Sequence, residues 1–299
     1  MTVERNNMAT VKATVTTSKS IAVAHDTSPF ISAYPWSTSG FGTKFSNPGT
    51  LPTGGGRGVA FTSAGDAIAV AHSISPYITA YPWSTSGFGT KFSDPPSIPF
   101  STGNGVAFTS AGNAIAVAHN GPPYITAYAW STSGFGTKFS DPGTLPANNG
   151  NGVAFTSAGN AIAVAHAGSP YISAYPWSTS GFGTKFSDPA TLPSSTGRGV
   201  AFTSAGDAIA VAHTTSPYIS AYPWSTSGFG TKFSNPGTLP TGTGIGVAFT
   251  SAGNAIAIST AASPFIDAYA WSTSGFGTKF SDPATLPAST GYSVAFGSV

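Results

Sequence analysis

Apolar residues fall in four short segments separated by turn residues, and this pattern repeats along the chain. In one copy the segments are Val59–Thr62, Ala67–His72, Tyr77–Trp83 and Thr90–Ser93. Gly, Pro, Ser, Asn and Asp cluster at each boundary, as the loops of β-hairpins require. β-Branched and aromatic residues dominate, and Gly or Pro interrupts the chain about every 10 residues, which disfavours helices. The pattern predicts four consecutive antiparallel strands per copy.

The copies follow one another at a fixed period of 47 residues, and Phe-Gly-Thr-Lys-Phe-Ser follows the tryptophan of each copy. The six tryptophans are Trp36, Trp83, Trp130, Trp177, Trp224 and Trp271. Four antiparallel strands repeated every 40–50 residues or so are typical of a β-propeller blade. A β-helix is the alternative, but its coils are usually shorter and its strands parallel. We therefore expect an all-β, six-bladed β-propeller.

The second segment predicts how neighbouring blades pack. Side chains alternate between the two faces of a strand, so Ala67, Ala69 and Ala71 share one face, and Ile68 and Val70 share the other. Both faces are apolar, which suits a sheet enclosed between two other sheets. The alanine face allows an adjacent blade to approach closely.

The stretch GVAFTSAGDAIAVAH, followed by SPYITAYPW, resembles the WD40-like repeats of YVTN-type β-propeller proteins, and the likeness extends over all six copies. Tyr81 stands at the place of the signature Trp, Pro82 replaces the Asp, and no Gly-His dipeptide precedes the first segment. The buried Asp-His-Ser-Trp network of true WD repeats is therefore not expected. The resemblance implies a fold rather than a function, although YVTN-like propellers include lactonase-type enzymes.

The repeat also predicts the domain boundaries and the closure of the ring. Residues 18–299 span 282 positions, which is six times 47. The chain ends in Ser293–Gly297, a copy of the first segment, whereas Thr10–Val15 lacks the Val-Ala-Phe core. We expect the C-terminal copy to supply the innermost strand of the first blade, which removes an open edge. Residues 1–17 then form an N-terminal arm, either an extra outer strand or a segment that docks on a partner.

Variation among the copies separates two rims of the disc. The second-to-third loop and the blade-to-blade loop emerge on one rim and change in every copy, while the turns on the other rim hardly change. The residues before each innermost strand should ring the mouth of the central channel: Arg57, Asn104, Asn151, Arg198, Ile245 and Tyr292. Arg57 and Arg198 are three blades apart and should face each other. We interpret this variable rim as a binding surface on a rigid frame, with drift of surface loops as the alternative.

Two polar residue types recur at fixed places. Five histidines end the second segment, and Thr260 takes the sixth place: His25, His72, His119, His166 and His213. They are too far apart to share an ion, and no carboxylate lies at ligand spacing, so we predict structural hydrogen bonds and no metal site. Six lysines lie in the fourth segment: Lys44, Lys91, Lys138, Lys185, Lys232 and Lys279. We interpret them as charges that discourage edge-to-edge aggregation, rather than as an anion-binding ring.

Candidate catalytic residues are sparse. Glu4 is the only glutamate, and the aspartates fall mostly in turns, with Asp26 and Asp267 unique to their copies. Hydrolysis needs paired acids or an activated nucleophile, so we expect neither an enzyme nor a cofactor. Tryptophans and tyrosines could form sugar-stacking pockets between blades, as in propeller lectins. Because Tyr81 and Trp83 share one face of the third segment, burial between blades is the favoured interpretation.

Composition narrows the remaining classes. Only 7% of residues are charged and the net charge is +2 without charge runs, so no nucleic-acid groove is expected. There is no cysteine, which excludes disulfides and thiolate chemistry. The polar N-terminus lacks an apolar stretch, and no apolar run approaches the roughly 20 residues of a membrane helix, so we expect no signal peptide and no membrane insertion.

These observations favour a non-enzymatic β-propeller that docks on or decorates a larger assembly through its variable rim and residues 1–17. A phage or other virion accessory or adhesion protein would fit this description, as would a cytoplasmic protein. A glycan-binding lectin and a lactonase-like hydrolase are the two alternatives.

Overall fold

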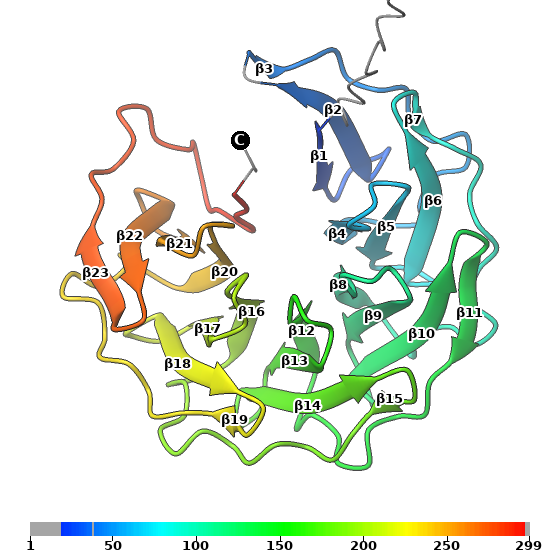
Figure 1. The fold of residues 1–299 in the computed structure, drawn as a ribbon. Helices are drawn as coiled ribbons and strands as arrows, with labels where there is room; N and C mark the ends of the chain where they lie inside the picture. The colour runs from blue at the N-terminus through cyan, green and yellow to red at the C-terminus, as the bar shows by residue number, and fades with distance from the viewer. Residues whose placement is uncertain (1–18, 38, 297–299) are drawn as a thin grey trace, which may run out of the picture.

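The computed structural model describes residues 19–37 and 39–296, and Figure 1 shows them as six sheets around a central axis. The predicted all-β, six-bladed propeller is confirmed. The described residues include no helix that could cross a membrane. The predicted N-terminal arm, residues 1–17, lies outside the described residues.

Each complete blade is a meander whose strands follow one another from the channel outwards, each antiparallel to the last. The innermost strands are β4 (Gly56–Phe61), β8 (Gly103–Phe108), β12 (Gly150–Phe155), β16 (Gly197–Phe202) and β20 (Gly244–Phe249). The second strands are β1 (Lys19–Ala24), β5 (Ala67–His72), β9 (Ala114–His119), β13 (Ala161–His166), β17 (Ala208–His213) and β21 (Ala255–Thr260). The third strands are β2 (Ile31–Ser37), β6 (Ile78–Ser84), β10 (Ile125–Ser131), β14 (Ile172–Ser178), β18 (Ile219–Ser225) and β22 (Ile266–Ser272). The fourth strands are β3 (Gly40–Phe41), β7 (Gly87–Phe88), β11 (Gly134–Lys138), β15 (Gly181–Phe182), β19 (Gly228–Phe229) and β23 (Gly275–Lys279).

The packing between blades follows the predicted division of the second strand into two faces. Ala67, Ala69 and Ala71 of the second blade pack against Ile115 and Val117 of the third, and the same arrangement recurs around the ring. All of these side chains are buried. The small face of each blade therefore receives the branched face of the next.

A cluster of aromatic rings completes each junction. Trp83 meets Phe45, Phe61 and Phe88 edge to face, with ring centroids 5.1, 5.2 and 4.9 Å away. Phe45 follows the first blade, whereas the other three rings belong to the second. Trp83 is only 8% exposed, and its counterparts in the later blades are equally buried. The predicted burial between blades is confirmed for these five tryptophans, whereas Trp36 of the first blade is only partly buried.

The fourth strand begins earlier than predicted. We expected Thr90–Ser93, but the strand of the second blade is β7, Gly87–Phe88, which pairs with β6 after a two-residue turn. Gly87 has a φ of +93°, a conformation that other residues rarely adopt. The hairpin that it closes places Phe88 against Trp83, so the aromatic contact fixes the register.

A proline in the third strand sets the length of the fourth. Where Pro82 or its equivalents lie in the third strand, the fourth strand has two residues. Where Ala129 or Ala270 takes this place, β11 and β23 have five residues. Proline has no N–H to donate to a neighbouring strand, so pairing stops beside it.

The first blade differs from the others in containing three described strands, β1–β3. The predicted closing strand, Ser293–Gly297, is described as far as residue 296. Ser293 and Val294 lie beside Gly246 of β20, as Gly105 and Val106 lie beside Gly58 of β4. The C-terminal copy therefore takes up the innermost position that follows β20. Its predicted pairing with the first blade is not among the strand pairs of the described residues.

This arrangement leaves one face of the first blade uncovered. Ile21 and Val23 of β1 are 37% and 47% exposed, whereas the equivalent Ile68 and Val70 of β5 are fully buried. In Figure 1 the ring is open between β1–β3 and β20–β23, with the C-terminal segment on its inner side. The junction between the sixth and first blades is thus the one at which the repeated packing is interrupted.

Pro82→Ala should lengthen β7 towards the five residues of β11, because it supplies the missing N–H. Amide hydrogen exchange at residues 89–91 should slow towards the rates at residues 136–138. Ala129→Pro is the matched reverse change and should accelerate exchange at residues 136–138. Unchanged exchange in both variants would contradict this explanation.

Candidate functional site

The loops are distributed over two rims as the meander predicts. The blade-to-blade loop before β4 contacts the second-to-third loop of the same blade: Thr53 Oγ1 donates to the Ser75 carbonyl at 2.7 Å, and Ser73 N donates to the Gly55 carbonyl at 3.0 Å. Both variable loops therefore form one continuous surface, which we call the variable rim. The other turns form the invariant rim.

The six predicted site residues lie at the channel mouth on the variable rim. Five of them occupy the second position of an innermost strand: Arg57, Asn104, Asn151, Arg198 and Ile245. Tyr292 follows Gly291, whose N–H donates to the Thr260 carbonyl just as Gly56 N donates to the His25 carbonyl. The innermost strands begin earlier than predicted, so five of these residues lie within the strands rather than before them. The binding role of these residues stays a prediction.

The two asparagines of this set link neighbouring blades. Asn104 Nδ2 donates to the Gly150 carbonyl at 2.8 Å, and Asn151 Nδ2 donates to the Gly197 carbonyl at 2.7 Å. By contrast, Arg57 and Arg198 are exposed and Tyr292 is 80% exposed. The variable rim therefore divides into side chains that brace the frame and side chains that face solvent.

A belt of serines explains part of the constancy of the invariant rim. The hydroxyl of Ser63 donates to the carbonyl of Ser110 in the next blade. Ser110, Ser157 and Ser204 repeat this bond to the following blade at 2.5–2.6 Å. Sequence reasoning missed this belt, because a serine in a Ser-Ala-Gly turn gives no sign of a bond across blades.

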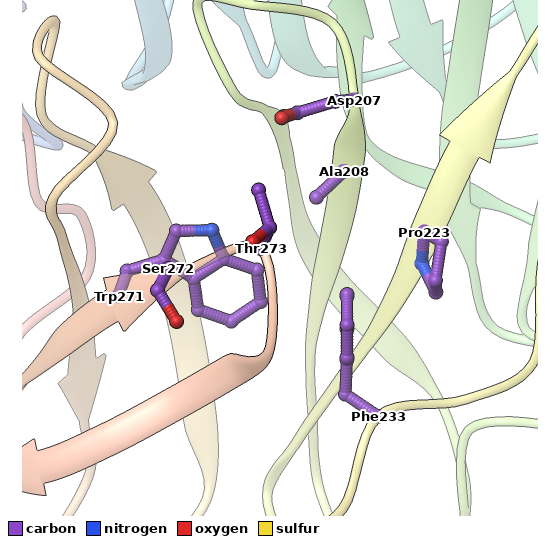
Figure 2. Close-up of a pocket in the computed structure, with 7 residues that line it drawn as sticks. All are labelled: Asp207, Ala208, Pro223, Phe233, Trp271, Ser272 and Thr273. Carbon is purple, nitrogen blue, oxygen red and sulfur yellow. The ribbon is translucent and has the colours of Figure 1, made fainter.

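A pocket of about 130 Å³ opens on the invariant rim between the fifth and sixth blades. Figure 2 shows its lining residues, which are Asp207, Ala208, Pro223, Phe233, Trp271, Ser272 and Thr273. A pocket of about 380 Å³ lies one blade earlier, where Asn160, Trp224 and Thr226 occupy the equivalent positions. Each pocket is lined by a tryptophan and by one of the phenylalanines that pack against it, which is Phe233 beside Trp271 and Phe186 beside Trp224.

The strand-end histidines form the structural hydrogen bonds predicted for them. His72 Nε2 lies 2.9 Å from Thr79 Oγ1, and His213 Nε2 lies 3.1 Å from Ser220 Oγ on the next strand. Burial lowers the pKa of His72, His166 and His213 to about 4 and also lowers the pKa of His119. These imidazoles are therefore neutral parts of the frame near pH 7.

The sixth blade replaces this pair with a buried ion pair. Thr260 stands at the histidine position and Asp267 at the Thr/Ser position, and both are buried. Lys279 Nζ lies 2.8 Å from Asp267 Oδ1 and 2.8 Å from Asp282 Oδ1. Hydrogen bonds to Asp267 and then Asp282 raise the pKa of Lys279. Asp267, unique among the copies, thus has a structural partner.

The remaining lysines bind a side chain three residues further on rather than forming a free basic ring. The carboxylate or amide partners are Asn47, Asp94, Asp141, Asp188 and Asn235. Across residues 19–37 and 39–296, no three histidine or acidic side chains gather as metal ligands would.

The comparisons with known proteins concern the fold alone. No protein-family model matches the chain, and no curated protein matches it. A solved structure of a candidate 6-phosphogluconolactonase from Bacteroides uniformis is similar with a TM-score of 0.70 at 12% identity, over 88% of this chain and 82% of that one. A functionally unknown protein from Desulfotomaculum acetoxidans gives a TM-score of 0.63 at 15% identity, over 87% and 80%.

The hydrazine synthase of Kuenenia stuttgartiensis is also similar, with a TM-score of 0.61 at 13% identity, over 80% of this chain and 70% of that one. Such low identity carries no information about activity. The structure and its neighbours define a β-propeller, consistent with a WD40-like or YVTN-type repeat protein.

Acidification should destabilise the protein between pH 6.5 and 4. The folded-state pKa of His72, His166 and His213 lies below the ordinary value, so the unfolded chain binds more protons in this interval and stability falls as pH falls. A shift of this size costs about 2 kcal/mol per histidine at pH 5. Chemical unfolding at pH 8 and pH 5 measures the effect. Equal unfolding free energies at the two values would refute it.

Asp267→Asn should lower the free energy of unfolding by about 2 kcal/mol, because Lys279 loses its buried counter-charge. The double variant Thr260→His, Asp267→Thr restores the pair found in the other blades and should recover most of this loss. Urea unfolding of the wild type, Thr260→His, Asp267→Thr and the double variant gives the coupling energy between positions 260 and 267. Strictly additive effects would show that positions 260 and 267 do not act as a pair.

Proposed function

We propose that the protein is a non-enzymatic binding module that docks on or decorates a larger assembly through its variable rim. The observation that carries the proposal is that the six predicted site residues of the variable rim include both side chains that brace the frame and side chains that face solvent. Residues that brace the frame are satisfied by hydrogen bonds within the protein, whereas Arg57, Arg198 and Tyr292 differ between blades and extend into solvent. Exposed Arg and Tyr side chains are frequent anchors of protein interfaces.

The use of the polar residues supports a non-catalytic role. The four histidines whose pKa is lowered lie buried in the frame, and Asp267 pairs with Lys279. Turn aspartates such as Asp66 and Asp207 accept hydrogen bonds from Thr62 and Thr203 at 2.6 Å. These groups hold strands and turns, and general acid–base work would require them to face a substrate.

The near-identical blades and residues 1–17 suit an accessory or adhesion protein of an assembly with many copies, such as a phage virion. In that setting residues 1–17 would add a second contact with the same assembly. Two linked contacts raise apparent affinity without enlarging either one.

The test uses the full chain with a photo-crosslinking residue in place of Tyr292. The chain is mixed with intact assemblies isolated from the organism that makes the protein, and the crosslinked partner is identified. Arg57→Ser, Arg198→Ser should weaken binding of the crosslinked partner by at least tenfold, as expected when two exposed anchors are lost. The matched control is Lys91→Ser, Lys232→Ser, which removes two positive charges that are also three blades apart. It should bind like the wild type.

Two results would overturn the proposal. One is an arginine double variant that binds the partner as tightly as the lysine control. The other is turnover of a substrate by the wild-type chain in a panel of lactones, which would favour the lactonase-like alternative.

A further inference from the structure

The pockets on the invariant rim are a second candidate site, separate from the variable rim. The larger lies between the fourth and fifth blades and the smaller between the fifth and sixth, with lining residues displaced by 47 positions. Each is bounded by the first-to-second turn of one blade and by a Trp-Ser-Thr sequence of the next. The same Trp-Ser-Thr sequence begins at Trp83, Trp130 and Trp177 in the earlier blades.

An indole N–H points into the pocket without a partner. Trp271 is only 7% exposed, and Phe233, Phe249 and Phe276 meet its ring edge to face at 5.0–5.3 Å. Within the described part of the chain its Nε1 donates no hydrogen bond. The nitrogen is not fully enclosed, so a molecule from solvent can reach it. Figure 2 shows this nitrogen at the edge of the ring beside Thr273. This N–H is therefore accessible at the pocket and is free to donate to an acceptor that a ligand supplies.

Further polar side chains line the same pocket. Asp207 Oδ1 accepts a hydrogen bond from Thr203 Oγ1, which leaves its other carboxylate oxygen open. Ser272 Oγ accepts from Ser274 N at 3.2 Å and can donate its own proton outward. Thr273 is exposed at the pocket mouth. The pocket can therefore both donate to and accept from the same ligand.

The charge at the acceptor position is not constant. Aspartate and asparagine alternate at the same place with the same bond from a threonine: Asp66, Asn113, Asn160, Asp207 and Asn254. A site for a cation would need the carboxylate each time. The oxygen common to all copies, Oδ1, is already bound by the threonine, and the remaining atom is a carboxylate oxygen in the aspartates and an amide nitrogen in the asparagines. A neutral hydroxyl group can donate to the first and accept from the second, so a neutral hydroxylated ligand fits every pocket.

One wall is mainly apolar. Pro223, Phe233 and Ala208 lie on the same side of the pocket as Asp207 and opposite Ser272 and Thr273 (Figure 2). A ligand with hydroxyl groups on its rim and C–H groups on its faces matches both walls. We infer that the inter-blade pockets of the invariant rim bind neutral saccharide units, one per junction, with the indole N–H donating to a sugar oxygen.

Repetition of the pocket around the rim allows weak individual sites to bind together. A pocket of about 130 Å³ holds part of one sugar unit, so each contact is weak. Several related pockets on one rim can engage a glycan-coated surface together, which raises apparent affinity by a factor of about 10² or more. This inference does not depend on partner docking at the variable rim.

The experiment observes the indole N–H groups directly in the full chain labelled with ¹⁵N-tryptophan. The probes are glucose, galactose, mannose, fucose, N-acetylglucosamine and N-acetylgalactosamine, together with multivalent conjugates of each. At least one sugar should shift the indole resonances with a millimolar Kd, and its conjugate should bind at least 100-fold more tightly. Absence of any indole shift at saturating concentrations of all six sugars would overturn the inference.

Variants separate the pockets from the rest of the surface. The five-fold variant Thr85→Val, Thr132→Val, Thr179→Val, Thr226→Val, Thr273→Val removes an exposed hydroxyl from each junction and keeps the side-chain shape. It should bind the conjugate at least tenfold more weakly with an unchanged Tm. Arg57→Ser, Arg198→Ser should bind the conjugate like the wild type, even where it loses the partner of the variable rim. Wild-type binding by the valine variant, or loss of binding in the arginine variant, would contradict the assignment.

Discussion

The ring depends on a contact that no single blade can make. At each of the five junctions from the first blade to the sixth, one tryptophan is enclosed by three phenylalanine rings, and one of these, such as Phe45 beside Trp83, comes from the preceding blade. Each edge-to-face pair contributes about 0.5–1.5 kcal/mol beyond the burial of its area. Alanine and Ile/Val faces complete the same junction. A blade therefore depends on its neighbours for much of its stability, as in other repeat proteins.

Much of this architecture could be predicted from the sequence. The period of 47, the two faces of Ala67–His72 and the burial of five of the six tryptophans all follow from spacing and side-chain size, and the structure confirms them. The start of the fourth strand could not be predicted in this way, because it depends on a positive φ at Gly87 and on the aromatic pair that this turn brings together. The effect of Pro82 on that strand requires knowing which N–H groups form the ladder.

For the candidate sites, comparison of the copies gave positions but not contacts. Comparison of the copies selected the residues at the second position of the innermost strands, yet only the structure separates Asn104 and Asn151, which bridge blades, from the exposed Arg57 and Arg198. The unchanging sequence of the invariant rim did not reveal its cause either. The invariant rim combines turn geometry, the serine belt and pockets with an unpaired indole donor, and a repeated motif in the sequence does not distinguish these causes.

The serine belt has a direction, since every hydroxyl described above donates to the following blade and every linked carbonyl accepts from the preceding one. A unit of 47 residues gained or lost between the second and sixth blades meets the same donor and acceptor on either side. Recombination among the nearly identical repeats of the gene would therefore produce chains whose remaining blades still fit together. The number of blades is then a property that evolution can change in whole steps, limited by the curvature of the ring.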